Sequence, residues 1–248
     1  MIDQPLDVQS VYILPDGSKG FFAARAADGY FQIYLAPMGG ITEPVPLTTT
    51  PGHKMSPMLS ADGNKIVFLQ GSAVQQPDAE CWTADMAVMN ADGSNLYLLP
   101  APLGWGVRHP SFSPDGSKIA MVLFECGFGG DSGIFIMNLD GSNLARITPD
   151  GPNGVLAVCP AFSPDGKQVV FSSVDGMSVY IVNTDGSGLK RLRSNGWDPL
   201  FIGDRIMFVS LGGKTQIYSM KADGTDVMQV TNDAFNDSFE VNVAWWQP

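Results

Sequence analysis

Short apolar runs alternate with turn-forming residues along almost the whole chain. The runs are rich in Ile, Val, Phe and Leu and are bounded by Gly, Asp, Ser and Pro, a pattern typical of β-strands joined by turns. No segment shows the sustained spacing of an amphipathic helix. The clearest runs are residues 33–35, 66–69, 119–124, 134–137, 169–171, 179–182, 206–209 and 217–218. The pattern predicts an all-β protein.

A motif built on Ser-Pro-Asp-Gly recurs between these runs. Residues 111–120 read Ser-Phe-Ser-Pro-Asp-Gly-Ser-Lys-Ile-Ala, and residues 161–170 read Ala-Phe-Ser-Pro-Asp-Gly-Lys-Gln-Val-Val. Residues 58–67 carry a third copy, residues 12–19 a weaker one, and residues 200–206 a contracted fifth. The aspartates of the first four copies in chain order lie at positions 16, 62, 115 and 165, which gives intervals of 46, 53 and 50 residues.

A second motif, Asn-x-Asp-Gly-Ser or a close variant, follows four of these copies, with its aspartates at positions 92, 140, 185 and 223. Each Asp-Gly favours a tight hairpin, because Gly accepts a positive φ and Asp bonds its own turn. Each unit therefore consists of four strands, A to D, with A–B and C–D joined by Asp-Gly turns. Four-stranded units repeating near this length are the blades of a β-propeller. We expect one propeller domain over residues 1–248, with five blades favoured and six not excluded.

Residues 160–192 carry both motifs in register and resemble the TolB-like β-propeller repeat. The resemblance covers essentially the whole chain and implies the propeller fold, an envelope setting and protein partners. Blades of this family serve scaffolds, peptidase gates and lyases, so the fold alone leaves the function open.

The last residues, 240–248, resemble a further A strand without the rest of a blade. A propeller must protect its sheet edges, and closing the ring does so. We expect residues 241–246 to form a strand that contacts residues 11–14.

The formal net charge of −11 argues against nucleic acid and against an anionic membrane surface as partners. The longest apolar stretch, residues 119–124, is too short to insert into a membrane. No signal peptide is visible, and three cysteines are too few for a disulfide scaffold. The chain is periplasmic or extracellular if a leader was removed, and otherwise cytoplasmic.

Strand polarity places the B–C and D–A loops together on the end of the propeller opposite the Asp-Gly turns. These loops vary in length between units, and such variation marks the binding face of a repeat protein. A protein, peptide or glycan is the expected ligand, although a loop Trp can also simply cover the blade core. The candidate contact residues are Trp82, Trp105, Arg108, His109, Trp197 and Asp198.

One further set comprises the residue before the A-strand proline of each unit, or its equivalent, which we expect at the channel mouth. The set is Ser10, Ser56, His109, Cys159, Asp198 and Asn242. Its His, Cys and Asp members suit a transition metal, but no short ligand motif supports one, and ordinary polar lining is favoured. Turn chemistry explains the Asp-Gly-Ser segments without calcium. We therefore expect no cofactor and a non-catalytic binding or scaffold protein, the alternative being a polysaccharide lyase or hydrolase with its site at the channel mouth.

Overall fold

A computed structural model describes residues 8–13, 17–38, 43–71, 84–99, 101–102, 104–125, 132–149, 156–173, 177–211 and 215–232. Every regular element in these segments is a β-strand. The described part of the chain consequently contains no helix able to cross a membrane.

The strands form five antiparallel sheets of four strands each, and the order within each sheet follows the chain. The first blade contains β1 (Val8–Ile13), β2 (Lys19–Arg25), β3 (Phe31–Pro37) and β4 (Val45–Pro46). The second contains β5 (Lys54–Leu59), β6 (Lys65–Gly71), β7 (Ala84–Asn90) and β8 (Tyr97–Leu99). The third contains β9 (Trp105–Phe112), β10 (Lys118–Glu125), β11 (Ser132–Asn138) and β12 (Ala145–Arg146). The fourth contains β13 (Ala157–Phe162), β14 (Gln168–Ser173), β15 (Ser178–Asn183) and β16 (Lys190–Arg193). The fifth contains β17 (Gly196–Ile202), β18 (Arg205–Leu211), β19 (Thr215–Lys221) and β20 (Met228–Gln229).

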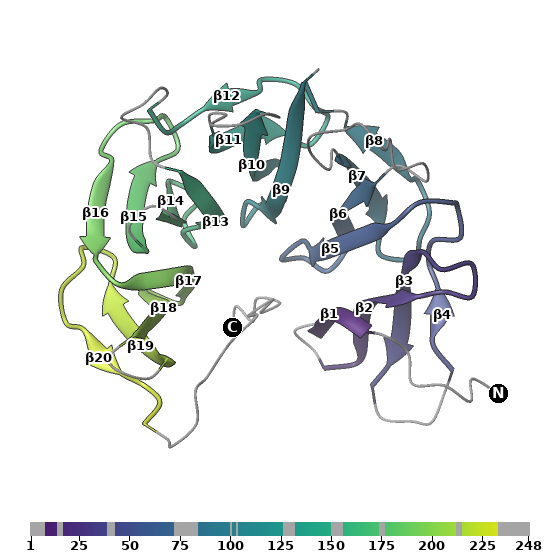
Figure 1. Ribbon diagram of the computed structural model, residues 1–248, viewed down its shortest axis with the longest axis horizontal. Coiled ribbons are helices and arrows are strands. Elements are labelled where there is room, and N and C mark those ends of the chain that lie inside the picture. Colours follow the sequence, from purple (N-terminus) through teal and green to yellow (C-terminus); the bar gives the residue numbers. More distant parts are fainter. Residues whose placement is uncertain are drawn as a thin grey trace.

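The blades are arranged around a common axis (Figure 1). The first strand of each blade lies nearest the centre and the short fourth strand lies at the periphery. The predicted all-β propeller with five four-stranded blades is confirmed.

The Asp-Gly motifs form the predicted turns through their own side chains. In the A–B turn of the third blade, Oδ1 of Asp115 accepts hydrogen bonds from Oγ of Ser113 at 2.6 Å and from the backbone N of Ser117 at 3.0 Å. Gly116 has a φ of 67°, which Gly adopts without a steric penalty. The equivalent residues of the second and fourth blades are Ser60, Asp62 and Asn64, and Ser163, Asp165 and Lys167.

The hydrophobic core lies between neighbouring blades, because successive side chains of a strand point to opposite faces. The central strands of the second blade are apolar on both faces. Ile66, Phe68, Ala87 and Met89 pack with the first blade, whereas Val67, Leu69, Met86 and Val88 pack with the third. Each large apolar side chain buried in this way contributes about 1.5–3 kcal/mol to stability.

The D–A connections are tied to the third strand of their blade by a recurring threonine. The hydroxyl of Thr48 accepts a hydrogen bond from the backbone N of Ile33 at 2.9 Å. Thr148 and Thr231 accept equivalent bonds from Ile134 and Ile217 at 3.0 Å. This contact anchors the start of each of these connections to the third strand of its own blade.

The strand predicted to close the ring, residues 241–246, lies outside the described residues, as does Leu14. This strand is predicted to contact residues 11–14. Two apolar side chains among them are exposed to solvent: Val11 is 53% exposed and Ile13 is 46% exposed. Closure by this segment therefore remains a prediction.

Candidate functional site

Four innermost strands carry the same irregularity at their centre. The residue before the strand proline has a left-handed backbone, with φ of 49° at Ser56, 49° at His109, 53° at Cys159 and 48° at Asp198. At each of these positions the pairing register with the second strand shifts, so two residues oppose one. A proline fits such a bulge because it has no N–H to donate to the ladder.

Positive φ in a residue other than Gly is sterically unfavourable, most of all for residues other than Asn, Asp and His. A bulge also re-aims the side chain of the strand that contains it. The four residues lie on adjacent innermost strands around the central axis (Figure 1). The same backbone conformation therefore carries a different side chain in each of the four blades. We call these four residues the bulge ring: Ser56, His109, Cys159 and Asp198.

Two members of the bulge ring are in contact across a blade boundary. The thiol of Cys159 donates a hydrogen bond to the carboxylate of Asp198, and the backbone N of Asp198 donates to Oγ of Ser172 at 2.8 Å. Burial, followed by the nearby charge of Asp198, raises the pKa of the Cys159 thiol well above its usual range. Burial also raises the pKa of Asp198, although the Cys159 hydrogen bond opposes this effect. Cys159 is therefore a protonated donor and not a thiolate nucleophile.

The third-blade part of the site combines a neutral imidazole with a cation. Desolvation, together with the adjacent charge of Arg108, lowers the pKa of His109 to about 4. His109 is exposed to solvent by its accessible surface, although the protein atoms around the imidazole desolvate it. The Arg108 guanidinium lies over the Phe124 ring, 4.3 Å from its centroid. At neutral pH, His109 can both donate and accept a hydrogen bond beside a fixed positive charge.

The predicted tryptophans have different environments. Trp105 is half-buried, packs against the core between the second and third blades, and meets the Phe135 ring edge-on with centroids 6.0 Å apart. Trp197 is half-buried on β17 and lies directly before Asp198. Trp82 lies outside the described residues, as does most of the variable loop that contains it. Arg108 and His109 are neighbours on β9, and Trp197 and Asp198 are neighbours on β17. Trp105 instead packs against the core.

A second ordered cluster at this end of the propeller was not predicted from the sequence. Lys54 is fully buried, and its Nζ donates to the carbonyl oxygens of Thr50, Pro51 and Gly52 at 2.7, 3.0 and 3.0 Å. Nδ1 of His53 accepts a hydrogen bond from the backbone N of Phe31 at 3.3 Å. Lys54 stands where the third, fourth and fifth blades have Val107, Ala157 and Gly196, so no repeated motif indicated this cluster.

No group of three His, Cys, Asp or Glu side chains suited to a metal ion occurs within the described segments.

A profile of the TolB beta propeller domain family matches residues 84–245, more than half of the chain. The chain belongs to the TolB β-propeller domain family. Among the curated relatives of this TolB-type chain, the Tol-Pal system protein TolB of Francisella tularensis strain SCHU S4 is 29% identical over 161 residues. That match covers 61% of this chain and 35% of the relative, so the chain spans about a third of the relative's length.

Solved structures support the same fold. The putative TolB from Agrobacterium tumefaciens superimposes with a TM-score of 0.67 and 20% identity, covering 91% of this chain and 81% of that one. An oligogalacturonate lyase in complex with manganese gives a TM-score of 0.69 and 17% identity, covering 88% of this chain and 63% of the lyase. At these identities the likeness to solved structures shows the fold alone, and the TolB-type repeat predicted from the sequence is confirmed by the family match.

Proposed function

We propose that this TolB-type propeller is a non-catalytic binding protein that recognises a peptide segment of a protein partner at the bulge ring and the adjoining B–C and D–A loops. The observation that carries the proposal is the positive φ at Ser56, His109, Cys159 and Asp198 on four adjacent innermost strands. Strained backbone positions cluster at ligand clamps and active sites, and here they display four different side chains on adjacent blades.

The chemistry of these residues suits a peptide. Asp198 accepts hydrogen bonds, neutral His109 donates and accepts them, and Arg108 supplies a cation, so backbone amides and an acidic side chain of a partner can be matched. The relatives named as Tol-Pal system proteins favour a protein partner over a glycan.

A phage-displayed random peptide library, selected on the immobilised chain, tests this proposal. Peptides should be enriched, and their affinity should fall by about tenfold or more in the double variant His109→Asn, Asp198→Asn. Asn tolerates the left-handed backbone, so these substitutions change chemistry and keep the bulge. Asp140→Asn, in an Asp-Gly turn at the other end of the propeller, is the matched control and should bind normally.

Failure to enrich any peptide, or binding that the double variant leaves unchanged, would contradict the proposal. The lyase alternative is tested in parallel by incubating the chain with polygalacturonate. Formation of unsaturated products would establish catalysis and overturn the non-catalytic assignment.

A further inference from the structure

A pocket of about 490 Å³ opens at the Asp-Gly end of the propeller, between the first and second blades. It lies at the opposite end from the loops of the proposed peptide site. Its volume is within the range of roughly 300–1,000 Å³ that is usual for small-molecule sites. Its main lining residues are Lys19, Phe21, Leu35, Asn64, Ala91 and Asp92.

One lining residue of this pocket differs in size from its counterpart in the third blade. The residue between Asn and Asp of the second motif is Ala91 in the second blade and Leu139 in the third. Leu139 packs against the core between the second and third blades, and its carbonyl accepts a hydrogen bond from the Tyr97 hydroxyl at 3.1 Å. Ala91 has a much smaller side chain, and the accessible apolar part of the pocket is mainly the half-buried Leu35, because Phe21 is only 2% exposed.

Hydrogen bonds hold the turns at the rim of the pocket, and the rim carries one cation and one carboxylate. The backbone N of Ala91 donates to the carbonyl oxygen of Asn64 at 2.8 Å, which joins the two turns of the second blade. Asp92 accepts hydrogen bonds from the backbone N and the hydroxyl of Ser94 at 2.9 and 2.6 Å. A carboxylate offers about four acceptor positions, so Asp92 retains capacity for a ligand. Lys19 supplies a cation at the start of β2.

A ligand that satisfies this lining needs three parts. It needs an anion for Lys19, a cationic donor for Asp92 and the amide oxygen of Asn64, and an apolar group for Leu35. We propose that the pocket binds a free amino acid with an apolar side chain, held by both its carboxylate and its ammonium group.

Isothermal titration of the whole chain with L-leucine tests this inference. Leucine should bind, whereas leucinamide, which lacks the carboxylate, and 4-methylpentanoate, which lacks the ammonium group, should each bind about tenfold or more weakly. Equal binding of leucine and leucinamide would assign the pocket to the amino terminus of a peptide and overturn the proposal. Absence of leucine binding would also overturn it.

Three variants locate the binding. Ala91→Leu installs the residue that the third blade carries at this position, so it should fill the pocket and abolish binding without disturbing the fold. Lys19→Gln should weaken leucine binding by about tenfold. Asp92→Asn should do the same, whereas Asp140→Asn, the same change in the equivalent turn, should not. Thermal unfolding of each variant shows whether it is folded, and undiminished binding by folded Ala91→Leu would exclude this pocket. The peptide-binding proposal is unaffected by these results, because it concerns the other end of the propeller.

Discussion

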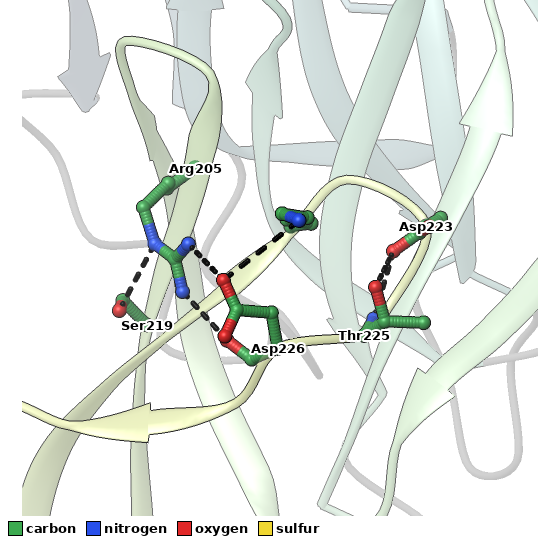
Figure 2. Close-up of polar contacts among 6 residues, drawn as sticks. Arg205, Ser219, Asp223, Thr225 and Asp226 are labelled. Carbon is green, nitrogen blue, oxygen red and sulfur yellow. Dashed lines mark hydrogen bonds and ion pairs between the residues drawn. The ribbon is translucent and has the colours of Figure 1, made fainter.

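The guanidinium of Arg205 holds Asp226 at two points. Its Nη1 lies 2.8 Å from Oδ2 and its Nη2 lies 2.6 Å from the backbone oxygen (Figure 2). Arg205 begins β18 and Asp226 follows the C–D turn, so the contact links the second strand of the fifth blade to its outer edge. The second, third and fourth blades have Asn95, Asn143 and Gly188 at the position of Asp226, all with positive φ.

We expect Asp226→Asn to lower the melting temperature slightly at low ionic strength and less at high salt, because an exposed ion pair is screened. Asn retains the backbone conformation, so the change isolates the charge. The Arg205 hydrogen bond lowers the pKa of Asp226, so the stabilisation is lost as the pH falls through that lowered pKa. Arg205→Lys cannot reproduce the fork of donors and should cost a similar amount. If the two changes are fully additive in the double variant, the contact does not contribute.

Because the turn aspartates have lowered pKa values, we expect the free energy of unfolding of the propeller to decrease in acid. Hydrogen bonds from Ser113 and Ser117 lower the pKa of Asp115 to about 2, from an ordinary value of 3.8. Bonds of the same kind lower the pKa values of Asp62, Asp92, Asp140, Asp165, Asp185 and Asp223. Their stabilisation is complete above the unfolded pKa and is lost as the pH falls through the lowered pKa values; for Asp115 this range is from about 4 to about 2. Urea unfolding at a series of pH values should show this loss, and it should be smaller in Asp115→Asn.

His109 predicts a separate pH effect in a higher range. Its folded pKa of about 4 lies below the ordinary value of 6.5, so the unfolded chain binds a proton first. Stability should therefore decrease as the pH falls from about 6.5 to about 4. NMR titration of the imidazole should give the lowered pKa directly, and His109→Asn should remove this part of the pH dependence. An imidazole that titrates near 6.5 would contradict the assigned environment.

Replacement of Trp105 should lower the stability of the fold, and this effect must be separated from any effect on binding. Trp105→Ala removes the edge-on contact with Phe135 and part of the core cover, so we expect a loss of about 2–3 kcal/mol in the free energy of unfolding. Trp105→Phe retains an aromatic ring and should lose less. Chemical denaturation measures both, and an unchanged unfolding midpoint for Trp105→Ala would show that the contact is not structural.

The repeat motifs were sufficient to predict the blades, because Asp-Gly turn chemistry is local. The positive φ at Ser56 and Cys159 could not be predicted, because neither residue type favours that conformation and the bulge follows from strand pairing. The contact of Cys159 with Asp198 depends on how neighbouring blades approach, which no single repeat encodes. The sequence left two roles open for Trp105, ligand contact and cover of the blade core, because a Trp before a strand suits solvent and core equally well; its packing against Phe135 agrees with the second.

At the pre-proline bulge the backbone conformation is constant between blades, whereas the side chain varies. The backbone is nearly the same at Ser56, His109, Cys159 and Asp198, although the four side chains have little in common. On the proposed function, single substitutions at these positions change what the centre of the propeller recognises without redesign of any strand. A lineage of such proteins could diversify its ligands one blade at a time, and an engineer could vary the same four codons as a compact library.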